Sequence, residues 1–434
     1  MAKFTTPKGT QDIYGAKALS FDHIEQTFAA IAQIYGFVPM RTPTFEATEL
    51  FERGVGETSD IVTKEMYTFI DKGNRSMTLR PEGTAGVMRA IVSEKLYATE
   101  DLPLKYYYSG KCFRYERPQL GRYREFHQFG VESVGVSSIF NDVEVILLGI
   151  TALNVLGLQN VSLKINTLGD ETSRLEYTKA LKEYFKPHFH EMCSDCQNRY
   201  EKNPLRILDC KVPSDQEIIK EAPSLSEFLS PSAKSEFDQL LNILEGYGVS
   251  YEIDDKLVRG LDYYSHTVFE FHYVSSKGKD YGAIGAGGHY EHLLEEVGGP
   301  SLPGVGFAVG IERLYSVLND DEILENIASS LDFYVMSVGE NSFDDAFSLL
   351  TALRGYGYQG DINFAKHSFK QLFKRAERAN ARYAIIIGDD EVANQVVNIK
   401  DLISQEQVSV AYGDVIDYID GLYNSEEHGH HDHE

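Results

Sequence analysis

Two strand-like segments joined by an arginine-rich loop constrain the fold of this chain more than any other feature of its sequence. Residues 106–116 and 124–135 have the texture of paired strands, and the connection between them is rich in positive charge. Like charges this close repel one another, so the segment predicts an antiparallel strand pair that meets a polyanionic ligand. The crowded side chains are Arg114, Arg117, Arg122 and Arg124.

The side chains of a strand alternate between its two faces, which divides each segment into two sets. If the sets that carry Arg114 and Gln128 point to the same side, they form a polar floor beside small glycines. A glycine inside a strand often marks a close approach by a ligand or by another backbone. The solvent face of an antiparallel sheet also alternates in this way, and that ordinary alternative stays open. The two sets are Gly110, Cys112, Arg114 and Glu116 on the first segment, and Arg124, Phe126, Gln128, Gly130 and Glu132 on the second.

Length and charge narrow the class of protein. The chain has 434 residues, which at about 150 residues per domain predicts two to four domains. Its net charge of -25 argues against a general DNA or membrane binder, although local basic patches can still hold a nucleic acid. No apolar signal region follows Met1, and the longest apolar stretch, 143–158, is too short to span a bilayer comfortably. We therefore predict a cytoplasmic protein that does not enter membranes.

Hydrophobic periodicity predicts the elements of a large first region. Residues 21–35 predict an amphipathic helix, and a proline-containing edge strand follows at 37–43. Thr84 is the expected N-cap of a helix that runs to about residue 97. Residues 170–250 are mostly helical in pattern and indicate an insertion. Further strand-like segments are 67–70, 76–80, 267–273, 282–286 and 305–310.

Beyond a linker at 320–330 the pattern changes to alternating strands and helices. Such alternation is typical of a small α/β domain with a partly parallel sheet. The alternating segments are 333–338, 343–356, 382–387 and 414–422.

Single arginines stand in two other unusual settings. Arg313 falls in the first turn of a predicted helix after Gly310, where the helix macrodipole disfavours a cation by up to about 1 kcal/mol. Two positive features at one place favour an anion site, although a surface arginine paired with Glu312 or another acid stays open as the alternative. Arg259 precedes Gly260 and a pair of tyrosines, a setting that says little by itself.

Together these segments resemble the class II aminoacyl-tRNA synthetases, and specifically the histidyl-tRNA synthetase family, over nearly the whole chain. The helix and strand that end at Pro43 resemble the first class motif. Residues 113–116 (Phe-Arg-Tyr-Glu) resemble the second motif, and residues 310–313 (Gly-Ile-Glu-Arg) resemble the third. Residues 259–264 (Arg-Gly-Leu-Asp-Tyr-Tyr) are similar to a signature of the histidine enzymes. The glycine-rich signature at 286–291 departs from the family, because it has a histidine where an arginine is usual.

The resemblance implies an α+β catalytic domain over residues 1–325 whose mostly antiparallel sheet is flanked by helices. A mainly helical insertion would interrupt this domain at about 170–250. An α/β anticodon-binding domain would occupy residues 330–423. The first class motif implies a homodimer, and the His-rich tail at 424–434 is expected to be disordered, with weak metal binding at most.

The resemblance also implies the reaction. In the family, the histidine carboxylate attacks the α-phosphate of ATP, and the resulting histidyl-adenylate passes its histidyl group to tRNA(His). ATP is therefore expected as a substrate, together with Mg2+. Two anions must meet, which requires positive charge placed in advance. The matching positions imply Arg114 at the α-phosphate and the carboxylate, Glu116 at the adenine amino group, and Arg313 at the γ-phosphate. Arg259 would lie at the α-phosphate, where other class members use a metal, and the three arginines are the predicted catalytic residues.

A histidine pocket follows from the same resemblance. Glu82, Thr84 and Gln128 match residues that hold the α-amino group, and Glu132 and Tyr264 match residues that hold the imidazole. An imidazole offers both a donor and an acceptor, so a site that pairs with both nitrogens rejects analogues that cannot. The predicted histidine-binding set is Glu82, Gly83, Thr84, Arg114, Gln128, Glu132, Arg259, Tyr263 and Tyr264.

Two basic features are candidates for contact with tRNA. The loop that carries Arg117, Arg122 and Arg124 is predicted to meet the acceptor end. The second feature is a stripe of positive side chains four residues apart, which share one side of a helix. A solvated helix face is the ordinary alternative, whereas phosphate contact would make tRNA binding sensitive to salt. The stripe is Lys366, Lys370, Lys374, Arg378 and Arg382, of which Lys370, Lys374 and Arg378 are the predicted contacts.

The insertion contains a weak candidate for a metal site. Cys193 and Cys196 form a Cys-x2-Cys pair, and His190 and Cys210 lie near enough in sequence to complete a zinc set. Reduced thiols are the ordinary state of cysteines in a cytoplasmic protein, and the sequence favours them over a metal.

Two other functions stay open from the sequence. A catalytically inert paralogue of the synthetases would sense histidine and regulate ATP phosphoribosyltransferase, but such paralogues typically lose the arginines and the last domain. A synthetase for another amino acid is disfavoured by the segment 259–264.

Overall fold

The computed structural model describes residues 4–56, 59–117, 121–258, 261–326 and 331–429. Contacts between Cα atoms divide the chain into two compact units, Met1–Glu325 and Asn326–Glu434. Each unit has its own sheet and its own hydrophobic core.

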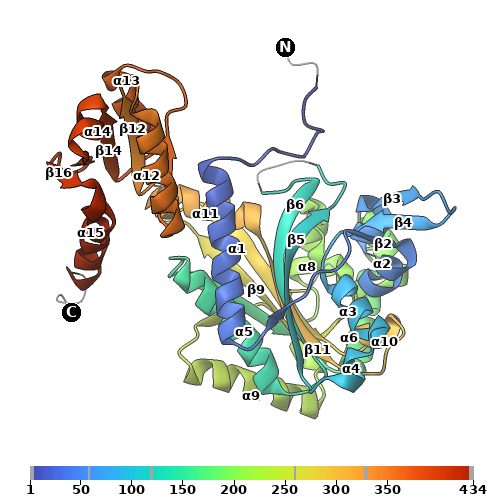
Figure 1. The fold of residues 1–434 in the computed structure, drawn as a ribbon. Helices are drawn as coiled ribbons and strands as arrows, with labels where there is room; N and C mark the ends of the chain where they lie inside the picture. Colours follow the sequence, from blue (N-terminus) through green and yellow to red (C-terminus); the bar gives the residue numbers. More distant parts are fainter. Residues whose placement is uncertain (1–3, 57–58, 118–120, 259–260, 327–330, 430–434) are drawn as a thin grey trace. The chain divides into compact units, whose positions relative to one another are not determined.

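The first unit is built on an eight-stranded sheet (Figure 1). In order across the sheet, the strands are β1 (Val38–Pro39), β5 (Leu104–Phe113), β6 (Glu125–Val134), β11 (Gly304–Gly310), β10 (Asp280–Tyr290), β9 (Tyr264–Val274), β7 (Val161–Thr167) and β8 (Tyr251–Ile253). The consecutive pairs from β5 to β7 are antiparallel, whereas the edge pairs β1–β5 and β7–β8 are parallel. The mostly antiparallel sheet confirms the predicted fold class, and β1 is the proline-containing edge strand.

The register of β5 and β6 decides which side chains share a face. Gly110 lies opposite Gln128, and Cys112 lies opposite Phe126. Residues directly opposite one another in an antiparallel pair point to the same side of the sheet. The two polar sets predicted from the sequence therefore lie on one face, where they can build a common site.

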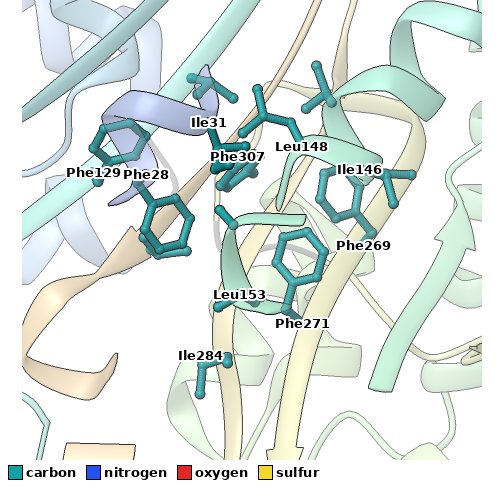
Figure 2. Close-up of a cluster of buried hydrophobic side chains, with 14 of the residues drawn as sticks. Phe28, Ile31, Phe129, Ile146, Leu148, Leu153, Phe269, Phe271, Ile284 and Phe307 are labelled. Carbon is teal, nitrogen blue, oxygen red and sulfur yellow. The ribbon is translucent and has the colours of Figure 1, made fainter. Parts of the chain in front are cut away.

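Helices cover the other face of this sheet. Phe28 packs on Phe129 with 5.2 Å between the ring centroids, within the buried cluster shown in Figure 2. Each large apolar side chain buried in this way stabilises the fold by about 1.5–3 kcal/mol. The covering helices are α1 (Ala16–Ile34), which is the predicted amphipathic helix, α5 (Ile139–Val155), α9 (Pro231–Gly246) and α11 (Ile311–Asp320).

The polar face carries a second core, rich in tyrosine, that includes Tyr108, Tyr264 and Tyr290. Short helices and the inserted region pack against it. The region 170–250 is helical apart from its connections, as predicted. The elements on this side are α3 (Thr84–Ser93), α4 (Leu96–Thr99), α6 (Glu171–Phe185), α7 (Ser194–Lys202), η2 (Pro204–Asp209), α8 (Pro213–Lys220), η3 (Leu225–Phe228) and α10 (Leu293–Glu296).

The start of α3 differs from the prediction. Gly83, not Thr84, is the N-cap, and the Glu82 carboxylate accepts hydrogen bonds from the backbone N–H groups of Thr84 and Ala85 at 2.7 and 2.8 Å. An acidic side chain supplied from before the helix satisfies the first free donors, so Thr84 lies inside the helix. The predicted single helix is also divided, because Lys95 takes a left-handed conformation between α3 and α4.

A three-stranded sheet beside the large one contains the predicted hairpin. Its strands are β2 (Phe45–Ala47), β4 (Ser76–Leu79) and β3 (Tyr67–Ile70), and α2 (Thr48–Val55) and η1 (Ile61–Glu65) complete this part of the first unit.

The second unit has a five-stranded sheet that is parallel over β13, β12 and β14 and antiparallel beyond them. This confirms the predicted partly parallel sheet. Two apolar clusters cover its two faces, one around Phe333 and one around Met336. The elements are β12 (Phe333–Val338), α12 (Phe343–Gly355), β13 (Gly360–Ile362), α13 (Phe369–Arg378), β14 (Tyr383–Gly388), α14 (Asp389–Asn394), β15 (Val396–Asp401), β16 (Gln407–Ala411), η5 (Tyr412–Asp414) and α15 (Val415–Gly429).

The last helix continues into the predicted tail. Helix α15 passes the predicted end near residue 422 and includes residues 424–429, which were expected to be disordered. Its sequence contains no proline, although Gly421 lies within the helix. The rest of the predicted tail, 430–434, lies outside the described residues. None of the helices in the described part of the chain is long and apolar enough to cross a bilayer.

Candidate active site

A small pocket of about 140 Å³ opens on the tyrosine-bearing face of the large sheet. Most of the residues predicted to bind histidine line it: Glu82, Thr84, Arg114, Gln128, Glu132, Tyr263 and Tyr264. Strand β9 is distant in sequence from α3 and from the β5–β6 pair, and the fold brings their residues together. The polar floor predicted from two strands is therefore one wall of an enclosed site.

Glu132 is buried in this wall and is surrounded by hydroxyl groups. Thr84 Oγ1 and the Tyr108 hydroxyl donate to its Oε1 atom at 2.7 and 3.3 Å, and the Tyr290 hydroxyl donates to its Oε2 atom at 2.8 Å. Burial raises the pKa of Glu132 to about 8, although the hydrogen bonds from Thr84 and Tyr290 favour the carboxylate. The Glu132 carboxyl therefore gains or loses its proton close to neutral pH, so it can share that proton with a bound ligand.

Glycines on three adjacent strands allow the pocket to exist. A Cβ atom on Gly306 would lie 2.2 Å from Glu132 Oε2 and 2.4 Å from the Val131 carbonyl oxygen. On Gly288 it would lie 2.6 Å from the Thr267 carbonyl oxygen, and on Gly130 it would lie 2.4 Å from the ring of Tyr108. These separations are far below a normal carbon contact, so any larger residue would displace the wall.

Glu82 serves both the pocket and the fold. It is buried, and burial raises its pKa even though two backbone N–H groups of α3 donate to its carboxylate. Gly83, also predicted to bind histidine, does not line the pocket but packs on Tyr108, whose ring would lie 2.1 Å from an added Cβ. The glycine is required by that close approach.

A larger pocket of about 650 Å³ adjoins the first, and the two share Arg114, Ala286 and Ala308. The Arg114 Nε atom donates to the Pro81 carbonyl oxygen at 2.9 Å, and the guanidinium lies 5.3 Å from the Phe126 ring centroid. Among the described residues, no hydrogen bond or ion pair takes up its two terminal nitrogens. Arg114 is therefore held by its stem with its charge available to both pockets.

The larger pocket also contains Arg313, Glu116 and Arg122. Arg313 donates to the Ala283 carbonyl oxygen, and burial together with the nearby Arg122 lowers its pKa, although an arginine stays protonated. Glu312 does not pair with it. Its carboxylate instead accepts from the His127 backbone N–H at 2.9 Å and lies 2.9 Å from His127 Nδ1. The alternative of a surface Arg313–Glu312 pair is therefore wrong, and Arg313 faces a cavity.

Other predicted residues lie elsewhere. Arg259 falls outside the described residues. Arg117 is exposed, and Arg124 is held by its own loop, with its guanidinium 3.8 Å from the Tyr115 ring centroid and its Nε donating to the Glu116 carbonyl oxygen.

The basic stripe in the second unit is only partly helical. Lys370, Lys374 and Arg378 lie exposed on α13, but Lys366 precedes this helix and Arg382 follows it. Arg382 pairs with Asp401 at 3.1 Å. A continuous five-residue stripe is therefore wrong, because Ser368 caps the helix and Asn380 takes a left-handed conformation after it.

His289, the departure in the glycine-rich signature, points away from both pockets. It is buried against Asp142, with Nδ1 3.0 Å from Oδ1, and the pair lines a separate cavity of about 210 Å³. Burial lowers the pKa of His289, but the charge and hydrogen bond of Asp142 outweigh this and raise it overall. The substitution therefore changes the far side of β10, whereas Tyr290 on the near side still reaches Glu132.

The candidate metal ligands differ from the predicted ones at one residue. Cys193, Cys196 and Cys210 come together with Asp215, whereas His190 is exposed and packs its ring edge-on against Phe189. The expectation that His190 would complete the set is wrong, because the turn at 186–192 carries that side chain away from the thiols.

Several lining residues were missed from the sequence. Tyr108 lies two residues before Gly110 and Tyr290 lies two residues after Gly288, so the two-residue alternation of a strand could have found both. Asp209 and Lys211 come to the larger pocket from the inserted region, and no local pattern signals this. Further missed residues are Leu261, Gly306 and Phe307 in the small pocket, and Tyr123, Glu270, His272 and Tyr281 in the larger one.

Comparisons with known proteins find relatives over nearly the whole chain. Residues 9–314 match the family described as histidyl-tRNA synthetase, and residues 332–422 match the family described as anticodon binding domain. A histidine–tRNA ligase of Lactiplantibacillus plantarum is 47% identical over 415 residues, which is 95% of this chain and 97% of the relative. One of Bacillus subtilis is 45% identical over 416 residues, again 95% of this chain and 97% of the relative. The crystal structure of apo S. aureus histidyl-tRNA synthetase has a TM-score of 0.82 at 36% identity and covers 96% of this chain and 99% of its own.

The first unit has a mostly antiparallel sheet, and a separate α/β unit follows it. These two features define a class II aminoacyl-tRNA synthetase fold. Both the family match and the near full-length identities point to one member of that class. The chain belongs to the histidyl-tRNA synthetase family.

Proposed function

We propose that this protein uses ATP to join L-histidine to tRNA(His) through a histidyl-adenylate, as a cytoplasmic step of protein synthesis. One observation carries the proposal: Arg114 lies on the shared wall of a small polar pocket and a larger basic one. A carboxylate held in the first pocket and a phosphate held in the second would meet at a single guanidinium. The names of the relatives support the same activity.

The small pocket fits histidine. Glu132 and Tyr264 would contact the imidazole, and Glu82, Thr84 and Gln128 would hold the α-amino group. The buried carboxyls supply acceptors in an environment of low dielectric constant, where hydrogen bonds to a bound cation are strong. Arg114 would then receive the substrate carboxylate.

The larger pocket fits the nucleotide. Glu116 would accept from the adenine amino group, and Arg313 would hold the γ-phosphate at the start of α11, where the helix end adds positive potential. Arg259 keeps its proposed role at the α-phosphate. Positive groups fixed before the reaction lower its barrier, because they need no rearrangement as charge shifts to pyrophosphate.

Mg2+ fits this pocket as a companion of ATP. Asp209 and Glu270 line it, and Mg2+ in such sites is usually held by one or two carboxylates and by substrate phosphates. When bound with ATP, the ion would screen the phosphate charge.

A homodimer is also part of the proposal. Apolar side chains are exposed on α1, β1 and β2, at the position of the first class motif. Ile34 is 76% exposed, and Val38 and Phe45 are each 51% exposed. An apolar edge of this kind is typical of a surface that a second subunit covers.

The activity is tested by exchange and charging assays. With ATP and labelled pyrophosphate, we expect label to enter ATP only when L-histidine is supplied, and we expect no comparable exchange with the other amino acids. Added tRNA(His) should then accept histidine. A chain that binds histidine without exchange would instead be a sensor, and exchange with a different amino acid would reassign the substrate.

Helix α13 gives a prediction for tRNA. Replacing Lys370, Lys374 and Arg378 together by glutamine should raise the KM for tRNA(His) and leave histidine-dependent exchange unchanged. If each contacts a phosphate, the log–log dependence of tRNA binding on salt should become less steep by about 2–3. Lys366→Gln is the matched control, because Lys366 is exposed but lies outside the helix. An unchanged salt dependence in the triple variant would mean that α13 is an ordinary solvated helix.

A further inference from the structure

We propose that Cys193, Cys196, Cys210 and Asp215 form a zinc site that fixes the inserted region. Their potential ligand atoms, three sulfurs and a carboxylate oxygen, all lie within 4.8 Å of one another. All three cysteines are free of disulfide bonds. Three thiolates with one carboxylate make a four-ligand set of the kind that Zn2+ takes in tetrahedral sites.

Two of the distances between the ligand atoms fit a tetrahedron. Cys193 Sγ lies 3.9 Å from Cys210 Sγ, and Cys210 Sγ lies 3.4 Å from Asp215 Oδ2. Zinc bonds of about 2.3 Å to sulfur and about 2.0–2.2 Å to oxygen, at tetrahedral angles, place two sulfurs ~3.8 Å apart and a sulfur and an oxygen ~3.5 Å apart. The observed separations therefore need little adjustment to accept the ion.

The surroundings also suit a metal. Cys193 is the N-cap of α7 and Cys196 lies in its first turn, so the start of one helix positions two of the sulfur atoms. The Val212 backbone N–H lies 3.5 Å from Cys210 Sγ, and the Cys193 N–H donates to the Asp215 carboxylate at 3.1 Å. Such outer hydrogen bonds orient ligands in metal sites.

The cluster is buried and already holds one negative charge. Cys196 and Asp215 are fully buried, and Cys210 is 4% exposed. The Asp215 carboxylate accepts hydrogen bonds from the Cys193 N–H, the Ser214 hydroxyl and the Cys210 thiol, and Zn2+ would take the place of the thiol protons beside it. The competing state, reduced thiols that donate to Asp215, uses the same contacts and must be separated from the zinc site by experiment.

The site would act on the larger pocket. Cys210 stands between Asp209 and Lys211, and both of these residues line that pocket. A metal that ties α7, the end of η2 and α8 together would hold the two side chains in place. This consequence for ATP binding rests on the proposed function, whereas the presence of zinc does not.

Metal content tests the proposal on the full chain. The histidines of the tail, from His428 onward, are changed to alanine so that they cannot hold zinc, and loosely bound metal is removed by dialysis against a weak chelator. We expect about one zinc ion per chain in elemental analysis. Cobalt(II) exchanged into the protein should show thiolate-to-metal charge transfer and the visible bands of a tetrahedral ion.

Variants locate the ion. Cys210→Ser should lose the zinc, and Asp215→Asn should weaken binding about 10- to 100-fold. Cys112→Ser is the matched control, because Cys112 is a buried free thiol outside the cluster, and it should keep the metal. If Cys210→Ser fails to fold, release of zinc from the tail-substituted protein by a thiol-specific mercurial still reports thiolate ligation. A tail-substituted protein that carries no zinc, or that keeps it when its thiols are blocked, would overturn the proposal.

If zinc is present, its removal should raise the KM for ATP more than that for histidine. If zinc is present but its removal leaves the KM for ATP unchanged, the zinc site stands and its proposed link to the larger pocket is wrong. Loss of exchange activity in a zinc-loaded protein would bear on the proposed function alone.

Discussion

Replacing Arg114 by glutamine is expected to lower histidine-dependent ATP–pyrophosphate exchange roughly 100- to 1000-fold. Removing one preorganised donor to a developing negative charge costs about 2.7–4 kcal/mol in the transition state. Arg114 lines both pockets and has no protein partner for its terminal nitrogens within the described residues, so little else should compensate for its loss. The reduction should appear in kcat more than in either KM, because the carboxylate and the phosphate meet at this group only as they react.

The control for this change is Arg75→Gln. Arg75 lies on the exposed hairpin between β3 and β4 and pairs with Asp71 at 2.7 Å. It lines neither of the two pockets. It should exchange label as the unmodified chain does. If Arg114→Gln retained full exchange while folding normally, the shared wall would not be the reacting centre.

Glu132→Gln is expected to raise the KM for histidine about 10- to 150-fold, since a hydrogen bond to a charged group contributes about 1.5–3 kcal/mol. Glutamine keeps the shape of the side chain but cannot pair as a carboxylate with an imidazole. The KM for ATP should hardly change, because Glu132 lines the small pocket and not the larger one. Glu144→Gln is a suitable control, as Glu144 pairs with Lys105 at 2.6 Å on the helical side. Unchanged discrimination for histidine would refute the imidazole assignment.

The pH profile sharpens this prediction. Between the pKa of a free imidazole, about 6.5, and about pH 8, the free protein carries a proton on Glu132 and free histidine has a neutral ring; the bound carboxyl–imidazole pair also carries one proton, so binding exchanges none. Above that pH the free carboxyl has lost its proton and binding must recover one. The kcat/KM for histidine should therefore fall as pH rises through about 8, and Glu132→Gln should lack this decline. A profile that rises through the same range would mean that the ionised carboxylate binds a neutral imidazole.

Local patterns were enough to predict much of the fold. Alternation placed β5 and β6 on the chain and correctly grouped Arg114 with Gln128, because the side chains of a strand have a fixed period. The texture of 170–250 likewise predicted helices. The short strands β13, β15 and β16 were not predicted, and neither was α14, whereas α13 was indicated only by the spacing of its basic residues. These elements are stabilised by pairing and packing within the small sheet more than by their own propensity.

The site could be predicted only in part, for a related reason. Motifs indicated arginines and carboxyls one segment at a time, and the resemblance supplied their roles. Asp215 lies with the three cysteines where His190 was expected, and Asp209 lines the larger pocket. Both positions depend on how the inserted helices fold back. Glu82 shows a further limit, since its two bonds to α3 follow from the path of the chain before that helix.

The glycine wall of the small pocket has a consequence for drug resistance. Gly130, Gly288 and Gly306 lie on neighbouring strands. A side chain added at any of them would collide with a ring, a carboxylate or a backbone carbonyl. A cell under selection by an inhibitor that binds against this wall could not exclude the inhibitor by adding a larger side chain there without disrupting the sheet. Escape would have to arise at the rim, where substitutions also touch residues that hold the substrate.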